Sequence, residues 1–429
     1  MKRRDFIKTT SVLASLTLLP SAAWAGIKKG KIRTAHIGVG GQGASDLRAI
    51  ASHPSVEVSA LCDVDVDRLS SAHLKHPDAK VFSDYRILFE KMGRKIDAVI
   101  VSTPDHTHAP ASMVAMDLGI PVYCQKPLTH LVSESRMLRK LAEEKSLVTQ
   151  MGIQIHSFKE YRSAVQLIQS GIVGKVHTIH AWSPKGWGYD GPVPVDSDPV
   201  PDYLDWNLWL GTAPERPYKK DIYHPAQWRK ILDFGGGALG DMGCHILDSP
   251  YMALGLDLPD TITTSCREPN GFSHPEKSIV TYEFPGTMYT TERLKCVWYD
   301  GEGAPKMSQD LELPEGVSLP GQGSIFVGEK GRLLLPHWEF PVLIVDGKIE
   351  KIDYPELEEQ DHYHQFIDAC MDKDTCSTPF SYSAKLSETV LLGVVAHSFP
   401  ESTLHFNREG LTFTEAEANS LLDATYRSF

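Results

Sequence analysis

A glycine-rich segment near the N-terminus has the residue types and spacing that bind phosphate groups. Gly38, Gly40 and Gly43 match the pattern Gly-x-Gly-x-x-Gly. The pattern alone is weak evidence, because the chain holds 33 glycines. Its context is more specific, since a strand is predicted over 32–38 and a helix over 43–52. In such a unit the first glycine permits a tight turn, the second lets the backbone approach a pyrophosphate, and the third lets the helix pack closely on the strand.

An acidic residue stands about 20 positions after this turn. Asp63 follows a predicted strand over 56–62, where its carboxylate is expected to accept hydrogen bonds from the adenosine ribose and to repel a 2′-phosphate. The N–H groups at the start of the helix, near Gln42, are expected to bind the phosphates. A solvated loop aspartate is the alternative, and Arg68 nearby could serve an added phosphate. We therefore predict a dinucleotide site that takes NAD rather than NADP.

An aspartate and a histidine four residues apart follow a glycine run in the middle of the chain. If this segment is helical, Asp241 and His245 lie on one face of the helix. Oxidation of a secondary alcohol needs a hydride acceptor, a base for the hydroxyl proton and donors for the substrate oxygens. Histidine has a pKa suited to such a base, and Asp241 can orient a hydroxyl or the histidine. The spacing also leaves open a solvated or capping pair and a metal-ligand pair.

Alternating strands and helices must position these residues in the first part of the chain. Further strands are predicted over 98–102, 122–124 and 147–151. The helices between them are predicted to end at Gly119 and to cover 134–145. This alternation predicts a parallel sheet wound on both faces.

The pattern changes after about residue 155. A Pro-, Gly- and Trp-rich stretch over 184–217 is predicted to be a long surface loop. Strands are predicted over 278–284 and 331–335, and the Asp-Gly pair within 342–349 predicts a hairpin. We expect an α+β domain with an antiparallel sheet and helices on one face.

Length, charge and cysteine usage narrow the class of protein. A chain of 429 residues is expected to form two domains. A net charge of −12, with no long basic run outside the extreme N-terminus, argues against nucleic acid and anionic membranes as partners. Seven cysteines without Cys-x-x-Cys spacing argue against a disulfide framework and a zinc site. No metal is expected.

The first 25 residues have the features of an export signal. A cationic start at 2–4 precedes an apolar stretch over 12–19, which is too short to span a bilayer, and Ala23-Trp24-Ala25 is a small-x-small cleavage site. The segment 3–8 resembles the twin-arginine motif, a receptor-read address rather than an anchor. We expect cleavage after Ala25, a periplasmic location, no membrane anchor, and a cofactor loaded before export and then held tightly. A frayed helix of the mature domain is the alternative.

Several motifs in order carry a resemblance to a known family. The segments are 102–108, 125–128 and 235–245, together with the glycine turn and Cys62-Asp63. In these the chain resembles the Gfo/Idh/MocA oxidoreductases, the family of glucose–fructose oxidoreductase and inositol dehydrogenase. The segments 205–211 and 226–229 look like its exported branch.

The resemblance implies a fold, a division and a set of catalytic residues. It implies an N-terminal Rossmann domain and a C-terminal α+β domain with a large open, mainly antiparallel sheet that often joins subunits of a homo-oligomer. The expected division is a twin-arginine signal peptide over 1–25, an NAD-binding domain over 31–152 and a substrate domain over 153–429. Substrates in the family are usually sugars, cyclitols or derivatives, and its lysine corresponds here to Lys126, with Asp241 and His245 as the other two catalytic residues.

Further site residues are predicted from their places in the expected fold. The family usually has Glu-Lys-Pro where this chain has Gln125-Lys126-Pro127, which removes a charge beside the nicotinamide. The candidates that border the cofactor are Thr103, Pro104, His108, Gln125 and Lys126. The candidates that face the substrate are Gln154, His156, Trp187, Trp228 and Arg229, and core or anchoring roles are open for the tryptophans. Residues 362–364 are predicted to head a helix from which they could reach the site, although helix capping or packing is the favoured role.

We therefore expect an NAD(H)-dependent oxidoreductase that transfers hydride between a secondary alcohol of a sugar, glycoside or cyclitol and tightly bound nicotinamide. One alternative is an NAD-dependent glycosidase that oxidises its substrate transiently and eliminates the aglycone. The other is a catalytically silent sugar-binding protein on the same fold.

Overall fold

The computed structural model describes residues 30–301, 305, 311, 313–315 and 317–429. The predicted signal peptide over 1–25 and its cleavage site lie outside the described residues. Within the described part, no helix combines the length and the apolar character needed to cross a membrane.

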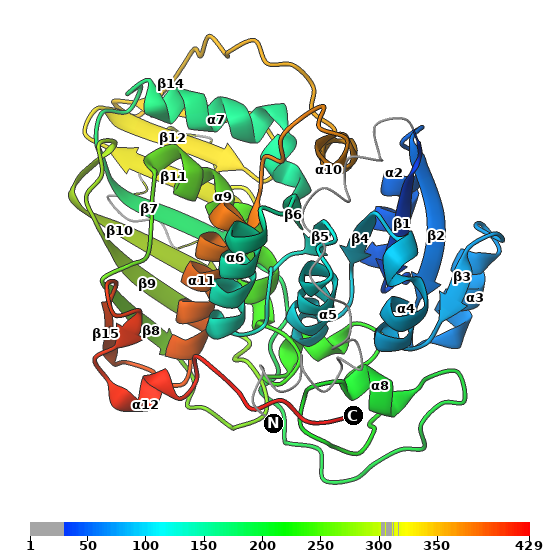
Figure 1. Cartoon of the computed structure of the whole chain (residues 1–429). Coiled ribbons are helices and arrows are strands. Elements are labelled where there is room, and N and C mark those ends of the chain that lie inside the picture. The colour runs from blue at the N-terminus through cyan, green and yellow to red at the C-terminus, as the bar shows by residue number, and fades with distance from the viewer. Residues whose placement is uncertain (1–29, 302–304, 306–310, 312, 316) are drawn as a thin grey trace.

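Six strands of the described chain form a parallel sheet near the N-terminus, in the order β3-β2-β1-β4-β5-β6 (Figure 1). The order reverses between β1 and β4, which is the Rossmann arrangement with its ligand crevice at the carboxyl ends of these strands. The elements are β1 (Ile32–Ile37), α2 (Gln42–Ala51), β2 (Val56–Cys62), α3 (Val66–His73), β3 (Lys80–Phe82), α4 (Tyr85–Met92), β4 (Ala98–Val101), α5 (Asp105–Asp117), β5 (Val122–Gln125), α6 (Val132–Lys145) and β6 (Thr149–Gly152).

The strands and helices predicted for this sheet are confirmed with small shifts at their ends. Three short elements were not predicted from the sequence: the amphipathic helices α3 and α4, and β3, which has no buried residue. The strands next to the switch point are buried along their whole length, as β4 and β5 show. Burial on both faces explains why their sequences read as continuous apolar runs.

Ten strands of the described chain form the second sheet, in the order β14-β13-β12-β11-β7-β10-β9-β8-β15-β16. Only β7 and β10 among these run parallel, so the prediction of a mainly antiparallel sheet is confirmed. The strands are β7 (Val176–Ser183), β8 (Thr261–Cys266), β9 (Ser278–Pro285), β10 (Thr290–Asp300), β11 (Gly323–Gly328), β12 (Gly331–Pro336), β13 (Val342–Val345), β14 (Lys348–Glu350), β15 (Thr403–Asn407) and β16 (Thr412–Phe413).

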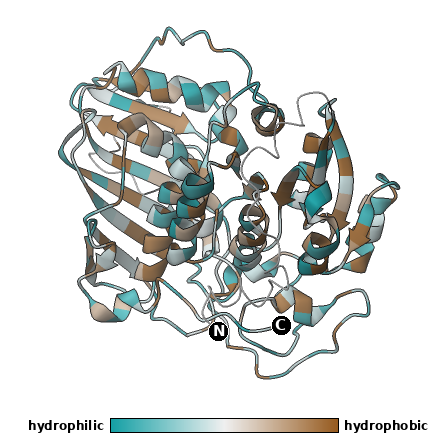
Figure 2. Cartoon of the chain, in the orientation of Figure 1, coloured by the Kyte–Doolittle hydropathy of each residue, from teal (hydrophilic) through white to brown (hydrophobic). Residues whose placement is uncertain are grey.

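Helices fill the space between the two sheets (Figure 1). The helices α7 (Lys159–Gln169), α9 (Gly237–Leu254) and α11 (Phe380–Ala396) pack on the second sheet, and α11 also packs on α6 of the Rossmann unit. Hydrophobic residues are abundant on the strands of both sheets, whereas the outer loops are mostly hydrophilic (Figure 2).

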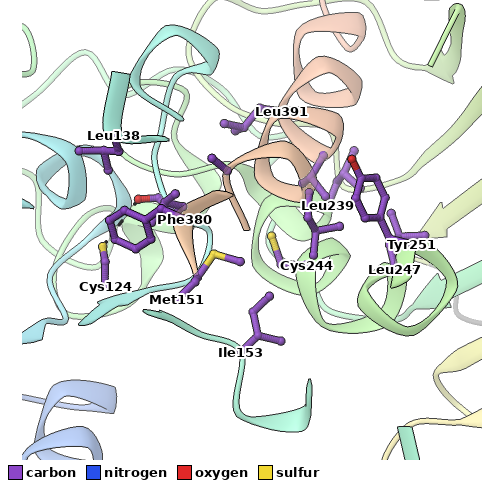
Figure 3. Packing of buried hydrophobic residues seen from close by; sticks show 14 of the residues in the cluster. Cys124, Leu138, Met151, Ile153, Leu239, Cys244, Leu247, Tyr251, Phe380 and Leu391 are labelled. Atoms are coloured by element: carbon purple, nitrogen blue, oxygen red, sulfur yellow. Dashed lines mark hydrogen bonds between the residues drawn. The ribbon is translucent and has the colours of Figure 1, made fainter. Parts of the chain in front are cut away.

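The largest hydrophobic cluster runs through this helical layer from one sheet to the other. Figure 3 shows its centre, where Met151 and Ile153 of the Rossmann side meet Cys244 of α9. All seven cysteines are free thiols, and most are buried in such packing. The layer therefore fixes the carboxyl edge of the first sheet against α9.

One helix from late in the chain belongs, by its packing, to the Rossmann unit. Helix α10 (His362–Cys370) begins where the sequence predicts, and Phe366 and Ile367 pack with Ile32 of β1 and Ile100 of β4. The division at 152 and 153 stays a prediction, and the packing adds that a segment beyond 153 covers one face of the first sheet.

The stretch over 184–217 is not the simple surface loop that the sequence predicts. It contains the helix α8 (Trp206–Leu210), and it buries Leu204 and Trp209 in an aromatic cluster with Phe234. Tryptophan rings supply enough apolar area to bury an irregular segment.

Candidate active site

The glycine turn has the geometry of a phosphate cradle. Gly38 has φ +83°, and a Cβ there would lie 2.5 Å from the carbonyl oxygen of Ser102. A Cβ on Gly43 would lie 2.1 Å from the carbonyl oxygen of Gly38. Helix α2 starts after Gly41 with no side chain capping its N–H groups, which leaves them for an anionic ligand. These residues fit the diphosphate of a dinucleotide.

Asp63 holds this turn from the end of β2. Its two carboxylate oxygens accept hydrogen bonds from the N–H groups of Val39, at 2.8 Å, and Asp65, at 3.0 Å. Burial raises the pKa of Asp63. The predicted hydrogen bonds to the ribose stay a prediction. Arg68 lies over Gly40 and pairs with Asp65 at 3.1 Å.

A cavity of about 830 Å³ opens beside the turn. Its walls include Val39, Gly40 and Arg68 from the Rossmann unit, with Tyr203 and His224 from the region between β7 and α9. It lies at the end of β2 and along α2 and α3, which is the adenosine side of a Rossmann site.

A buried carboxylate accepts hydrogen bonds from two residues predicted to bind the cofactor, Gln42 and Gln125, and from two others. Asp46 of α2 accepts hydrogen bonds from Gln42 at 2.8 Å, Ser102 at 2.7 Å, Gln125 at 2.9 Å and the hydroxyl of Tyr363 at 3.3 Å. Burial raises the pKa of Asp46. A glutamine at 125 can donate to this carboxylate and a glutamate cannot, which gives a physical reason for the departure from Glu-Lys-Pro.

Lys126, at the end of β5, meets Asp241 of α9 in the centre of the site. The Lys126 Nζ donates to the Asp241 Oδ1 at 2.8 Å and to its carbonyl oxygen at 2.9 Å. Arg229 Nε donates to the same carboxylate at 3.1 Å, and Trp187 Nε1 donates to its other oxygen at 2.8 Å. The side chains of Lys126 and Asp241 are 12% and 11% exposed. The structure thus brings together four predicted residues, each from a different segment of the chain.

Charge balance at this cluster keeps Asp241 ionised. Burial alone would raise the pKa of Asp241, but the adjacent Lys126 and Arg229 cations hold it well below its usual value. Asp105 lies near the same two cations, Lys126 and Arg229. It belongs to the motif over 102–108 but was not given a role from the sequence. It accepts a hydrogen bond from the Gly236 N–H at 3.2 Å. Burial raises the pKa of Asp105 to about 7.

His245 lies one turn after Asp241 and is buried with its Nδ1 unpartnered among the described residues. Burial and the nearby Lys126 and His337 lower the pKa of His245 well below its usual value. The imidazole is therefore neutral, the form that accepts a proton. The His337 ring lies 6.0 Å from the His245 ring, and its Nδ1 is hydrogen-bonded to the Tyr161 hydroxyl at 2.6 Å.

His337 and Tyr161 were not predicted from the sequence, because neither lies in a motif. Tyr161 is on α7, and His337 follows β12 at a turn in which Trp338 has φ +75° and is largely exposed. The only sequence signal is the uncommon pair His337-Trp338 after an apolar strand. The rings of His337 and Trp338 are 5.2 Å apart. A row of aromatic rings therefore runs from the buried His245 through His337 to the exposed Trp338.

His156 follows β6 in the short helix η3 (Gln154–Ser157). Its Nδ1 donates to the two carboxylate oxygens of Asp248 at 2.8 and 3.0 Å, and the Tyr382 hydroxyl donates to Asp248 Oδ1 at 2.7 Å. The Gln154 Oε1 is buried without a partner among the described residues.

The remaining predicted residues have varied surroundings. Trp228 is buried in the aromatic cluster, and the Arg229 guanidinium lies 4.3 Å from its ring centre. Both ring nitrogens of His108 face backbone carbonyls, of Pro127 and Thr103, at 2.8 Å each. Their contact with a ligand stays a prediction, as does that of half-buried Thr103 and Pro104 at the start of α5.

Two models of one family together match more than half of the chain. Residues 32–153 match the oxidoreductase family with an NAD-binding Rossmann fold, and residues 159–283 match the C-terminal α/β domain of the same family, Gfo/Idh/MocA. The chain belongs to this oxidoreductase family. Its N-terminal sheet is accordingly an NAD-binding Rossmann fold, as the glycine turn predicts.

In the described part of the chain, no group of three or more His, Cys, Asp or Glu side chains could hold a metal ion.

Curated proteins resemble the chain over part of its length. The chain is 28% identical over 193 residues to a glycosyl hydrolase family 109 protein of Stenotrophomonas maltophilia, and the match covers 42% of each of the two chains. It is 27% identical over 202 residues to inositol 2-dehydrogenase of Corynebacterium glutamicum, which covers 45% of this chain and 58% of that protein. The chain spans about half the length of the curated relatives it matches.

A solved structure of a dehydrogenase shares the whole fold. The WlbA dehydrogenase from Bordetella pertussis, in complex with NADH and UDP-GlcNAcA, superposes with a TM-score of 0.58 at 16% identity. The match covers 88% of this chain and 99% of that chain.

Proposed function

We propose that this protein is an NAD(H)-dependent oxidoreductase that oxidises a secondary alcohol of a sugar, glycoside or cyclitol, or reduces the corresponding ketone. The observation that carries the proposal is the meeting of Lys126, Asp241 and neutral His245 at the carboxyl edge of an NAD-binding Rossmann sheet. The relatives named as inositol and levoglucosan dehydrogenases support the carbohydrate class.

Each of these side chains has a role that its surroundings support. Bound NAD supplies the hydride acceptor. The Lys126 ammonium donates a hydrogen bond to the reacting oxygen and stabilises its developing negative charge. His245 takes the hydroxyl proton. Asp241, held by Trp187 and Arg229, positions Lys126 through its 2.8 Å ion pair.

A substrate screen tests the proposal. Glucosides, free sugars and inositols are each added to the purified protein, and the absorbance of the reduced nicotinamide is followed. We expect one class to reduce the bound cofactor, with no response from a variant that lacks Lys126. A silent sugar-binding protein, the alternative on the same fold, would bind a sugar without any change in cofactor absorbance.

We further propose that NAD stays bound through the catalytic cycle. A strap, residues 199–226, lies across the loop after β2: the Val66 N–H donates to the Tyr203 carbonyl at 2.8 Å, and the Asp205 N–H donates to the Val64 carbonyl at 3.0 Å. The His224 Nε2 lies 2.8 Å from the Asp65 Oδ2, within hydrogen-bond distance. A cofactor loaded in the cytosol and carried by twin-arginine export to the periplasm is consistent with this strap. Protein purified without added nucleotide should contain NAD, and the exported form should begin at Gly26.

We also propose a homo-oligomer formed through the second sheet. Its outer face exposes Ile279 of β9, while the flanking Ser278 and Val280 are buried. Sedimentation of the wild type and of Ile279→Asp tests this, with a lower mass expected for the variant.

An NAD-dependent glycosidase is a second candidate function. The observation that favours it is the pair His156 and Asp248, a further proton acceptor that simple alcohol oxidation does not need. The similarity to the glycosyl hydrolase family 109 protein supports the same class. Release of aglycone without net NADH would distinguish it from a dehydrogenase.

A further inference from the structure

Trp338 is an exposed tryptophan near the proposed active site. It is 61% exposed, and no other tryptophan among the residues that the structure describes is classed as exposed. It lies in the turn after β12 with φ +75°, a conformation that is unfavourable for a bulky side chain and that glycine adopts freely. Packing of the core does not account for an indole at this position, because most of the residue faces solvent. A role at the surface is therefore the better explanation.

Ring contacts join Trp338 to the proposed catalytic residues. The Trp338 ring lies 5.2 Å from the His337 ring, and the His337 ring lies 6.0 Å from the His245 ring. The Tyr161 hydroxyl is hydrogen-bonded to the His337 Nδ1 at 2.6 Å, which holds the middle ring in place. The indole is therefore two ring contacts away from the proposed base, on the side that leads to solvent.

The two tryptophans that the sequence predicts to face the substrate have other contacts. Trp228 is 6% exposed in the aromatic cluster, and the Arg229 guanidinium lies 4.3 Å from its ring centre. Trp187 donates to Asp241 at 2.8 Å, and its ring centre lies 5.2 Å from the same guanidinium. These two rings hold the charged cluster in place. The Trp338 ring, in contrast, is largely open to a ligand.

We propose, resting on the proposed function, that the Trp338 indole stacks on the ring that is linked to the reacting sugar. The reacting sugar binds at Lys126 and His245, and the next ring along the glycosidic bond lies toward the indole. An aromatic aglycone has apolar faces and a sugar ring has one, so either can cover the indole and remove its surface from water. The substrate class is then a glycoside with an aromatic aglycone or a second sugar, rather than a free monosaccharide or cyclitol.

The exposed apolar area at this turn suits a single ring better than a second copy of the chain. Phe340, two residues further on, is 41% exposed and has its ring 4.8 Å from the Tyr354 ring, and the exposed Glu339 between them is charged. A fully buried aromatic side chain covers about 150–250 Å², whereas a stable interface covers about 800 Å² on each partner. A few partly exposed rings beside a charge fall well short of that area.

The test compares ligands that share the reacting sugar and differ in the ring attached to it. Calorimetry measures the binding of methyl β-glucoside, phenyl β-glucoside and cellobiose to the purified holoprotein, and likewise of the two α-glucosides and maltose. In one anomeric series we expect a ligand with a second ring to bind about fivefold more tightly than its methyl partner, the size of one stacked aromatic contact. Preference for the phenyl glucoside assigns an aromatic aglycone, and preference for the disaccharide assigns a second sugar.

Removing the indole should remove this preference. Trp338→Gly is the first variant, because glycine adopts φ +75° without strain and keeps the turn. Its affinities for the methyl glucoside and for the ligand with a second ring should agree within about twofold, and the affinity for the methyl glucoside should stay at the wild-type value. Trp338→Phe keeps an aromatic ring and should keep part of the preference. The matched control is Phe340→Ala, which removes an exposed ring of the same turn that contacts Tyr354. It should keep the full preference.

Melting temperature and NAD content check the fold of each variant, and Trp338→Asn, which also tolerates a positive φ, decides the case if Trp338→Gly does not fold. An unchanged preference without the indole, or no preference for a second ring in the wild type, overturns the role of Trp338. An equal loss in Phe340→Ala also overturns it, because the whole turn would then be responsible. A lower mass of Trp338→Gly in sedimentation, with the preference kept, would instead assign the indole to a contact between subunits. Hydride transfer is measured separately, and its absence with every alcohol overturns the proposed function without affecting the comparison of affinities.

Discussion

At the scale of single residues, the chemistry of the site depends on which of its buried side chains are charged and which are neutral. Asp241 stays ionised because two cations touch it, while His245 on the next turn stays neutral because burial and Lys126 disfavour its charged form. A neutral imidazole beside an ammonium is ready to accept a proton as the ammonium stabilises the alkoxide.

Removing the imidazole tests that reading. His245→Ala should reduce turnover by at least about tenfold, because general-base catalysis is lost, with substrate binding largely kept. Steady-state kinetics with the alcohol found by the screen measures this. His405→Ala, at an exposed position on β15, is the control. Unchanged turnover in His245→Ala would remove His245 from the mechanism.

The buried Asp105 predicts a dependence of stability on pH. Burial raises its pKa from 3.8 to about 7, so the folded protein binds a proton that the unfolded chain releases near pH 3.8. This contribution to stability is complete below the unfolded pKa and is lost as the pH rises through the folded pKa. Asp105→Asn stays neutral throughout.

Melting temperatures across the pH range check this. The stability of Asp105→Asn relative to the wild type should increase between about pH 5 and pH 8. Asp78→Asn, which changes an exposed carboxylate, should keep a constant difference from the wild type. A constant difference for Asp105→Asn as well would contradict the raised pKa.

Gln125 predicts a specific cost for restoring the usual Glu-Lys-Pro motif. Gln125→Glu would replace a donor to Asp46 by a second buried carboxylate, which is unfavourable through both lost hydrogen bonding and like charge. We expect a loss of roughly 1–3 kcal/mol in the free energy of unfolding. Denaturant titration measures it, with the exposed Gln166→Glu on α7 as the control. A loss no larger than that of the control would show that Asp46 does not need this donor.

At the scale of elements, the turn between β1 and α2 depends on contact between backbones. A Cβ on Gly43 would meet the Gly38 carbonyl oxygen at 2.1 Å, and backbone cannot move aside as a flexible side chain can. The same turn opens the helix whose uncapped N–H groups face the phosphates.

Gly43→Ala should therefore lose NAD, because α2 has to move away from β1. The measurement is the nucleotide content of the purified protein together with NAD affinity by calorimetry. Gly321→Ala is the control, since a Cβ there meets nothing within 4 Å. Full NAD content in Gly43→Ala would show that the turn can open without harm.

The stretch over 184–217 packs differently from the surface loop predicted for it. Its Pro and Gly residues indicate a loop, and the backbone is indeed mostly irregular. What composition does not indicate is that Trp209, Trp228 and Phe234 form their own core, and that the segment is hydrogen-bonded to the loop after β2.

At the scale of the whole molecule, the site lies between two sheets that share one continuous hydrophobic core. The central cluster continues from the Rossmann sheet through α9 and α11 to the second sheet, and α10 returns to cover β1 and β4 (Figures 1 and 3). We therefore expect the two halves to unfold together.

Phe366 in α10 tests that coupling. It is fully buried, so Phe366→Ala should cost about 3–5 kcal/mol. Fluorescence of the tryptophans in the second half and NAD release from the first half should shift together in denaturant. Ile349→Ala on exposed β14 is the control. Two separated transitions in the wild type would contradict the shared core.

Local patterns were enough for much of the fold and part of the site. Apolar runs predicted the strands of the Rossmann unit, the glycine turn predicted the dinucleotide site, and the Asp-Gly pair predicted the β13–β14 hairpin. Lys126, Asp241 and Arg229 were named from motifs. Asp46 and His337 were not, because neither is a motif position and each meets its partner only through packing. Tyr363 was named from its expected place at the head of a helix, but its partner Asp46 was not.

The sequence by itself determined the class of fold, the cofactor and the chemical types at the site, since these depend on short-range spacing along the chain. The tertiary structure decided what each group can do. Burial and neighbours from distant segments made Asp241 an anion, His245 a neutral base and Asp105 a group that titrates near neutral pH. They also turned His156 toward Asp248, a contact between residues 92 positions apart. Charge and proton affinity depend on solvation and on contacts through space, and no local pattern encodes them.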